Sequence, residues 1–361
     1  MSVLASGITN TLTQVRDRLA GRGDALKGMA LWLLIGALVV WSALDATQLF
    51  VVGVIVGSIY TLGSLGLTLV YGVLKFGNFA HGDTMMLGAY IAYFFLTGHV
   101  ARNAREDIEI PWALDSLPGA VDGFADLSFG YGLIIAALLA AAVIAFLSIG
   151  LDRLVYRPLR RRRSGIVIFA IASLGVAIIV RSVMFIFWGP DPRVYVEGIH
   201  KAQSYPFDIV LKTDQIFIFA VAVALTAATY LLLFNTKLGK AMRAMADNPD
   251  LARISGINTE QIIAWTWVFG GALVAVAGVL LAVQSQVNPL LGFVLLLPLF
   301  ASTILGGIGN PLGALAGAMV VGIAQEVSIE IFAPAYKPGV AFVILILILL
   351  VRPRGLLGAK V

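Results

Sequence analysis

The sequence contains no cysteine and few charged residues, and these two shortages exclude several kinds of protein. Without cysteine there can be no disulfide bonds and no thiol chemistry. Charged residues make up 12% of the 361 positions, 60% of the residues are hydrophobic, and the mean hydropathy is +0.95. A water-soluble domain carries a more highly charged surface than this. The composition therefore indicates a protein that crosses a membrane several times.

Histidine is also scarce, and a phosphate-binding loop is missing. The three histidines, His81, His99 and His200, are too far apart in sequence to suggest a local metal site. No G-x-x-x-x-G-K-[ST] loop occurs, so we expect the chain to bind no nucleotide or other cofactor itself and not to be an enzyme. If it transports a solute, either a partner or an ion gradient has to supply the energy.

Apolar runs recur along the whole chain and predict an all-α fold of about ten membrane-spanning helices. Crossing the ~30 Å hydrocarbon layer takes ~20 residues, and several runs are shorter, so eight spans are also possible. The runs cover residues 29–45, 49–72, 78–97, 130–151, 165–188, 215–234, 260–283, 290–308, 311–332 and 338–351.

The positions of lysine and arginine predict the orientation of these spans, because basic residues collect in cytoplasmic loops. The loop at 152–163, the loop at 235–258 and the tail at 352–361 are all basic. By contrast, the segment 98–129 has an acidic excess and is expected to be periplasmic. We therefore expect a cytoplasmic tail at 1–28, a transmembrane domain at 29–351 and both termini in the cytoplasm. The net charge of +5 is explained by this topology, without nucleic acid as a partner.

A polar island, KFGNFAHGD at Lys75–Asp83, interrupts two apolar runs. Only 14 residues remain from Thr84 to Thr97, too few to cross the membrane, so the island should enter it as part of a discontinuous or re-entrant segment. Irregular backbone at that depth is tolerated only against protein or a water-filled cavity. The candidate substrate-path residues are Asn78, His81, Gly82 and Asp83.

Two interpretations of the island remain open. In the first, the amino end of a broken helix lines a path and directs its positive dipole at a substrate carboxylate. In the second, Asn78 or Asp83 caps a helix while His81 bonds a neighbouring carbonyl. A capping residue inside a pore can also be part of the pore wall.

The loop at 235–258 is expected to form two short helices at the cytoplasmic surface. Leu238, Met242 and Met245 lie at i, i+4 and i+7 and form one apolar stripe. Asn248 followed by proline then predicts the start of a second helix that stops at Gly256. Such a loop can dock a partner, or its stripe can simply pack beneath its own spans.

Two glycine patterns suggest close helix packing in the membrane. In LGGIGNPLGALAG, glycines at i, i+4 and i+8 follow one another on one helical face, and Gly53 and Gly57 repeat the spacing in an earlier run. A gate or a contact with a partner subunit is the alternative. The candidate residues of the longer stretch are Gly306, Gly309, Gly313 and Gly317.

Few ionisable residues lie within the predicted spans, and Arg181, Glu326 and Glu330 are the main ones. Arg181 and Glu326 should reach a similar depth near the outer surface, where they could pair. We favour separate snorkelling of the two side chains to the interface, as long side chains near helix ends commonly do.

Read together, KFGNFAHGDTMMLGAY (75–90), LGKAMRAMADNPDLARISGIN (238–258) and LGGIGNPLGALAG (305–317) resemble the permease subunit of bacterial ABC importers for branched-chain, hydrophobic amino acids. The resemblance runs from about Leu49 to Arg354. It implies a multi-pass protein of the bacterial inner membrane that forms the path with a second, related permease. Two cytoplasmic ATPase subunits, which bind and hydrolyse ATP, and a periplasmic substrate-binding protein complete the system. The implied ATPase-coupling residues are Lys240, Arg243, Asp247, Asn248 and Pro249.

Other functions stay open on the sequence alone. A permease for urea or a short amide would share the family pattern, and the motifs do not rank these substrates. An ion-coupled secondary transporter needs acidic residues deep in the membrane, for which Asp83 alone is weak evidence. A membrane-embedded hydrolase using His81 and Asp83 lacks an obvious nucleophile or ligand cluster. The acidic segment 98–129 departs from the compact family pattern.

Overall fold

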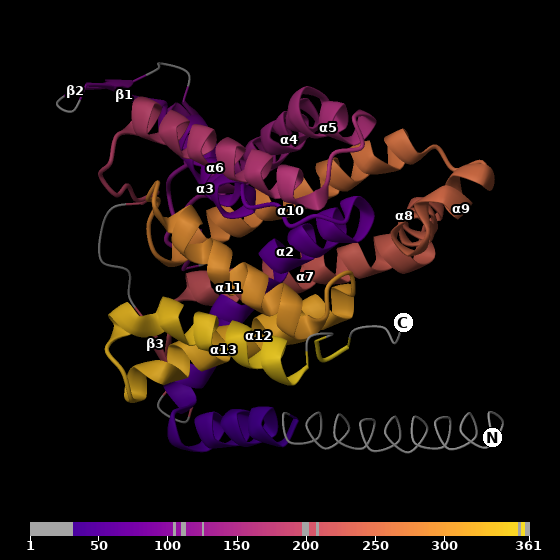
Figure 1. Cartoon of the computed structure of the whole chain (residues 1–361). Coiled ribbons are helices and arrows are strands. Elements are labelled where there is room, and N and C mark those ends of the chain that lie inside the picture. The colour runs from indigo at the N-terminus through magenta and orange to yellow at the C-terminus, as the bar shows by residue number, and fades with distance from the viewer. Residues whose placement is uncertain are drawn as a thin grey trace, which may run out of the picture.

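The computed structural model describes residues 32–103, 106–109, 113–124, 126–196, 202–206, 209–352 and 355–357, and it is predominantly helical (Figure 1). A π-helical turn at Asp152–Tyr156 joins α4 to α5, and an N-terminal helix at Trp32–Asp45 precedes α2. The numbered helices are α2 (Thr47–Leu74), α3 (His81–Thr97), α4 (Tyr131–Leu151), α5 (Arg157–Arg161), α6 (Ile166–Trp188), α7 (Thr213–Asn235), α8 (Lys237–Asp247), α9 (Pro249–Ile254), α10 (Thr259–Gln284), α11 (Leu291–Gly306), α12 (Pro311–Val327) and α13 (Lys337–Val351).

The apolar runs of the sequence correspond closely to these helices. Among the described residues, seven helices are long and apolar enough to cross a membrane: α2, α4 continued into α5, α6, α7, α10, α12 and α13. The other three expected runs form shorter helices, namely the N-terminal helix, α3 with 17 residues and α11 with 16 residues. The described part of the chain is therefore that of a polytopic helical protein, in which long apolar helices are combined with shorter ones, and the expected number of about ten spans remains a prediction.

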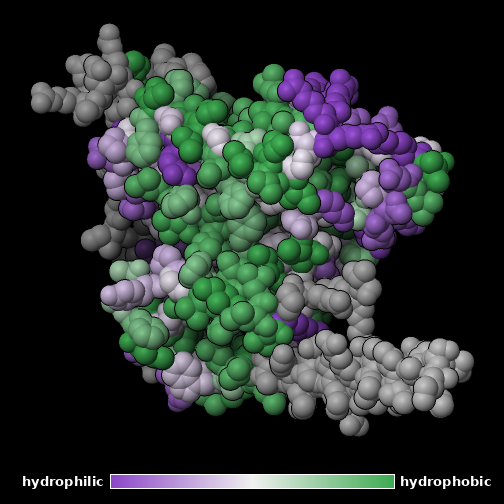
Figure 2. Space-filling view, in the orientation of Figure 1, coloured by the Kyte–Doolittle hydropathy of each residue, from purple (hydrophilic) through white to green (hydrophobic). Residues whose placement is uncertain are grey.

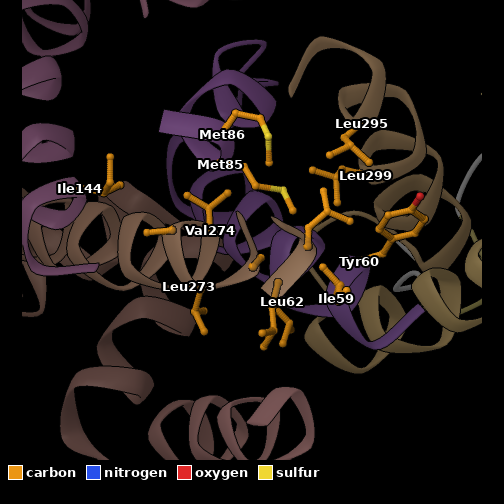
Figure 3. Packing of buried hydrophobic residues seen from close by; sticks show 14 of the residues in the cluster. Ile59, Tyr60, Leu62, Met85, Met86, Ile144, Leu273, Val274, Leu295 and Leu299 are labelled. Atoms are coloured by element: carbon orange, nitrogen blue, oxygen red, sulfur yellow. The ribbon is translucent and has the colours of Figure 1, made fainter. Parts of the chain in front are cut away.

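The centre of the bundle is built from α2, α3 and α10. In the most apolar part of α2 and of α10, 72% of the residues are buried, against 22% for α7 and 11% for α13. Figure 3 shows Met85 of α3 among Val274 of α10, Leu299 of α11 and Leu62 of α2. Helices that are apolar all round are buried in this way, while α6, α7 and α13 form the outside.

Glycines allow these central helices to touch backbone to backbone. A side chain on Gly278 of α10 would place its first carbon 1.9 Å from the carbonyl oxygen of Met85 in α3. The predicted packing role of Gly57 is confirmed, because a side chain on Gly322 of α12 would come within 2.5 Å of the Gly57 Cα. Small residues let helices approach closely in lipid, where dispersion contacts drive association.

Two short hairpins depart from the expected all-α fold. Strands β1 (His99–Asn103) and β2 (Glu106–Glu109) pair antiparallel, as do β3 (Gln203–Tyr205) and β4 (Ile209–Leu211). The first hairpin begins the acidic segment 98–129. The Tyr131 hydroxyl donates to the Pro118 carbonyl at 2.8 Å, and the Ser128 amide donates to the Asp214 carboxylate at 2.8 Å. These bonds fasten the segment across the ends of α4 and α7.

The short helices α5, α8 and α9 lie toward the opposite end of the bundle from the hairpin β1–β2 (Figure 1). Figure 2 shows a hydrophilic surface over this end and a broad hydrophobic surface over the middle of the molecule. The arrangement brings the basic loops at 152–163 and 235–258 to one end, as the charge pattern predicts. The predicted tail at 1–28 lies outside the described residues.

Candidate functional site

The polar island forms an irregular segment between α2 and α3. Helix α2 ends where Lys75 adopts a left-handed conformation with φ 60°. Helix α3 starts at His81 after Ala80, without a capping side chain, so Asp83 is the third helical residue and its predicted role as a cap is wrong. Asn78 precedes the helix, and its side-chain oxygen accepts the Ala80 amide at 3.1 Å. Asn78 thus stabilises the turn rather than the helix end.

Helix α6 shows how deep the island lies. The Phe79 amide donates to the Ser173 hydroxyl at 3.0 Å. Ser173 follows the start of α6 at Ile166 by seven residues, which corresponds to about 10 Å along a helix axis. The island therefore lies within the layer of spanning helices, in agreement with the prediction that it enters the membrane.

Three consecutive island residues point to three different neighbours. The His81 ring nitrogen Nε2 is 2.8 Å from the Gly63 carbonyl oxygen of α2, so the predicted bond to a neighbouring carbonyl is present. Gly82 meets α11, where a side chain would place its first carbon 2.1 Å from the Gly292 oxygen. The cavity beside His81 measures about 10 Å³, far too small for an amino acid. His81 and Gly82 therefore hold helices together in this structure.

Asp83 instead forms a two-point ion pair with Arg181 of α6. The arginine Nε and Nη2 atoms donate to the two carboxylate oxygens, each at 2.9 Å. The expected snorkelling of Arg181, and its alternative pairing with Glu326, are both wrong. Glu326 bonds the Lys337 ammonium at 2.7 Å. The reason is that α3 begins inside the bundle and presents a carboxylate at the depth of Arg181.

Arg181 lies at the boundary between the buried pair and an exposed aromatic face. The Asp83 side chain is fully buried, whereas that of Arg181 is 20% exposed, with its guanidinium 4.7 Å from the Phe293 ring centre. Phe293 of α11 is largely exposed. Phe300, on the same helix as Phe293, packs against Phe79 of the island. We call Phe79, Arg181, Phe293 and Phe300 the aromatic face. It joins one cation to apolar surface at mid-bundle depth.

The far half of α3 is held by aromatic side chains. Burial raises the pKa of the Tyr195 hydroxyl well above its ordinary value, so this group stays protonated and donates to the Ala89 carbonyl at 2.9 Å. The Trp188 ring packs against that of Tyr90 at a tilt of 34°, and its N–H donates to the His99 carbonyl at 3.0 Å. These contacts fix the carboxyl half of α3.

A groove of about 680 Å³ lies at the end of the bundle that carries α8, and it brings the three motifs together. Lys75 of the island donates from its ammonium to the Ala246 carbonyl of α8. Gly309 and Asn310 of the glycine-rich stretch form the opposite wall, and the Asn310 amide donates to the Leu357 carbonyl at 2.7 Å. Segments more than 60 residues apart in sequence thus share one cavity.

The two predicted short helices are confirmed as α8 and α9. Met242 and Met245 are buried beneath α8, as the stripe predicts. The Asn248 side chain accepts the amides of residues 250 and 251, proline follows at the first helical position, and Gly256 ends the segment with φ 85°. All five candidate coupling residues are exposed: Lys240, Arg243, Asp247, Asn248 and Pro249.

Sequence reasoning missed an apolar tip on α9. Leu251 is 56% exposed and Ile254 is 81% exposed, at an otherwise polar end of the molecule. Arg243 stacks on the Phe234 ring at 4.5 Å, so its charge is held at a fixed place beside the groove. The sequence carried a signal for this tip. A helix of six residues, such as α9, can bury only one side, so its remaining apolar residues have to be exposed.

The glycine-rich stretch divides into two roles. Gly306 and Gly313 pack against each other, since a side chain on either would meet the other's carbonyl oxygen within 2.2 Å. Gly317 packs against the Ser302 carbonyl in the same way. Gly309 does not share this packing. It lies in the turn before α12 with φ 85°, no atom lies near the position of its missing side chain, and it lines the groove.

An ion-pair network that the sequence did not reveal clamps the basic loop to α10. Asp152 accepts the Trp267 ring N–H at 2.8 Å and the Arg160 Nη2 at 2.9 Å. Arg157 pairs with Glu260 at 2.9 Å. Two arginines of the basic loop at 152–163, Arg157 and Arg160, thus form ion pairs within the protein, while the loop as a whole also indicates the orientation of the chain.

Comparison with known proteins agrees with this architecture. Residues 49–349 match the family model described as "Branched-chain amino acid transport system / permease component". The chain belongs to this family. It is 34% identical over 318 residues to the high-affinity branched-chain amino acid transport system permease protein BraD of Pseudomonas aeruginosa, covering 86% of this chain and 95% of that protein.

Two further relatives represent two differently named permeases. The chain is 32% identical over 313 residues to the high-affinity branched-chain amino acid transport system permease protein LivH of Escherichia coli K12, covering 85% of this chain and 93% of LivH. It is 22% identical over 334 residues to the probable branched-chain amino acid transport permease protein LivM of Methanocaldococcus jannaschii, covering 84% and 91%. As a member of this family, the chain is a multi-pass membrane permease.

Proposed function

We propose that this permease is one of two related membrane subunits of an ABC importer for branched-chain amino acids in a bacterial inner membrane. Cytoplasmic ATPase subunits bind and hydrolyse ATP and drive the cycle, and a periplasmic protein delivers the substrate. This subunit itself uses no cofactor. The observation that carries the proposal is the family match over 301 residues, which spans both the island and the coupling helices.

The names of the relatives support the substrate and the second subunit. BraD and LivH are named for high-affinity branched-chain amino acid transport. The chain also resembles a LivM protein, which is what two related permeases in one importer would produce. The higher identity to BraD and LivH than to LivM supports a place on the LivH side of such a pair.

The aromatic face is the best candidate for a wall of the substrate path. The substrate is a zwitterion with an apolar side chain, and the face offers a cation beside exposed phenylalanine rings. The Asp83 carboxylate balances the charge of Arg181, so the surface presents donors without a net buried charge. Of the four island residues predicted to line the path, we therefore retain Asp83, which acts by holding Arg181 in place.

We expect the groove and the tip of α9 to dock an ATPase subunit. Replacing Asn248 by alanine removes the cap of α9, which typically costs about 1 kcal/mol in helix stability. Replacing Arg243 by glutamate reverses the charge beside the groove. Both changes should lower ATP-driven uptake several-fold and reduce co-purification of the ATPase, while the two permeases still assemble.

Arg162→Glu is the matched control for Arg243→Glu, because Arg162 is also an exposed arginine but lies on another loop. Its uptake should stay close to that of the unchanged protein. Unchanged uptake and ATPase binding in both the Asn248 and Arg243 variants would remove the docking role from these helices.

Proteoliposomes test the whole proposal. The complete complex should accumulate leucine, isoleucine and valine only with ATP and the binding protein, and urea should not compete. If uptake by this chain alone followed an imposed ion gradient, the chain would be a secondary transporter instead. If urea were the preferred solute, the subunit assignment would stand and the substrate would change.

A further inference from the structure

A lysine ends helix α2 in a backbone conformation that usually belongs to glycine. Lys75 follows the last residue of α2 and is left-handed, with φ 60° and ψ 27°. Residues with a side chain meet steric resistance in this conformation, whereas glycine does not. After α3 and α6 the chain has glycine with positive φ at the same position, namely Gly98 with φ 67° and Gly189 with φ 76°. A role of the side chain is the expected reason for a lysine at this strained position.

The Lys75 side chain binds the carboxyl end of α8. Its ammonium donates to the Ala246 carbonyl oxygen. Because α8 ends at Asp247, this carbonyl is among the last four of the helix, which have no amide partner within it. A cation at this end also interacts favourably with the helix dipole. The backbone of α2 is close too, since a side chain on Gly72 would place its first carbon 3.9 Å from the Ala246 Cβ.

The two ends of α8 are attached to different parts of the protein. At the amino end, a side chain on Gly239 would place its first carbon 2.2 Å from the Leu232 carbonyl oxygen of α7, the helix that precedes α8 in the chain. At the carboxyl end, Lys75 provides a bond across 171 residues of sequence. The contact at Lys75 therefore leads from α8 directly into the polar island.

The island connects Lys75 with the aromatic face. Phe76, the next residue, is buried, and its ring centre lies 5.1 Å from that of Phe169 on α6. The following contacts with α6 are the amide bond of Phe79 and the ion pair of Asp83. A segment that is held against α6 at three points thus joins the end of α8 to the aromatic face.

We propose that Lys75 is a positioning residue that links α8 to the polar island, so that a displacement of α8 by the ATPase is transmitted to the aromatic face. The inference rests on the proposed function, because it requires an ATPase at α8 and a substrate path at the aromatic face. In this role Lys75 contacts neither the substrate nor ATP. It makes the position of one site depend on the position of the other.

Lys75→Gly removes the side chain at a position where glycine suits the backbone. The Tm of the purified protein should therefore stay the same or rise slightly. In proteoliposomes with the complete complex, the ATPase should co-purify in unchanged amount and ATP hydrolysis should continue. Leucine uptake should fall by about fivefold or more, so more ATP is hydrolysed per leucine. Lys75→Arg should restore most of the uptake, because a guanidinium can donate to the same carbonyl.

Arg163→Gly is the matched control. Arg163 is another exposed basic residue with left-handed backbone, φ 53°, but it lies in the basic loop after α5 and not in the island. Its replacement by glycine should affect the Tm in the same direction as Lys75→Gly. Uptake, and the ATP hydrolysed per leucine, should stay at the values of the unchanged complex.

Thiol labelling provides a measurement that needs no transported substrate. The chain has no cysteine, so Phe79→Cys introduces a single thiol into the aromatic face, at a side chain that is 38% exposed. The complex is assembled with cysteine-free partner subunits. ATP binding should change the labelling rate several-fold when Lys75 is present, and should leave it unchanged when Lys75→Gly is added.

The inference is overturned if Lys75→Gly supports normal coupled uptake, or if that variant loses the ATPase, since Lys75 would then act in docking alone. It is also overturned if Lys75→Arg or Arg163→Gly is as defective as Lys75→Gly. A labelling rate at position 79 that responds to ATP equally with and without Lys75, or in neither case, has the same consequence. These outcomes leave the proposed function in place. The proposed function fails instead if the unchanged complex takes up no leucine with ATP.

Discussion

Replacement of Asp83 by asparagine is expected to lower the free energy of unfolding by about 3–5 kcal/mol, because it leaves the Arg181 guanidinium in the bundle without its counter-charge. Asparagine has nearly the same shape as aspartate, so packing is preserved and the change isolates the charge. Arg181→Gln should be similarly damaging, since it leaves a carboxylate that is fully buried. Denaturant-induced unfolding of the purified protein in detergent measures both effects.

The double variant Asp83→Asn/Arg181→Gln distinguishes the pair from its separate residues. It removes both charges at once and should recover much of the stability lost in each single variant. Transport by the complete complex should nevertheless remain impaired, because the aromatic face has lost its cation. Normal transport in the double variant would limit Asp83 and Arg181 to a structural role.

Glu260→Gln is the control for an exposed ion pair. Glu260 and its partner Arg157 are 47% and 36% exposed, so loss of this pair should cost no more than about 1 kcal/mol. If Asp83→Asn and Glu260→Gln proved equally mild, the pair at Asp83 would not be the buried, mutually dependent contact that its geometry indicates.

A single methyl group at Gly278 is expected to prevent normal packing of α3 on α10. The new carbon would lie 1.9 Å from the Met85 carbonyl oxygen, and a backbone atom within a helix cannot move aside as a side chain can. Gly278→Ala should therefore destabilise the protein by at least about 3 kcal/mol, the upper end of ordinary overpacking costs. The yield of monodisperse protein and its unfolding midpoint are the measurements.

Gly175→Ala is the matched control for this substitution. Gly175 also lies inside a spanning helix, α6, but nothing lies within 4 Å of the added carbon. Alanine favours a helix over glycine, so stability should stay the same or rise slightly. Equal losses at both positions would mean that glycine supports the helices by some means other than close contact.

The two helices of the loop at 235–258 were predictable from sequence because their signals are local. Asn248 followed by proline defines a helix start, and the spacing of Leu238, Met242 and Met245 defines the buried face within two turns. The place of Gly309 in a turn could also have been read from the sequence, since proline after Asn310 marks the start of the helix and leaves Gly309 before it. The prediction relied on helical spacing instead and wrongly grouped Gly309 with the packing glycines.

The partner of Asp83 was not predictable from one sequence. Arg181 is 98 residues away, and its depth was judged by counting along a single helix. That count matched it with Glu326, which actually pairs with a lysine eleven residues further on. The short hairpin at 99–109 was missed for another reason, because its charged residues are of types depleted in strands.

The backbone contacts made through glycine divide the bundle into an interlocked part and a looser part. Helices α2, α3, α10, α11 and α12 touch one another where a side chain would collide. By contrast, α6 meets α3 through side chains, the Asp83–Arg181 pair and the rings of Trp188 and Tyr90. Tightly packed surfaces switch between discrete arrangements instead of deforming gradually. We therefore expect any rearrangement of the bundle to keep the five interlocked helices together and to occur first where α6 contacts α3 through side chains.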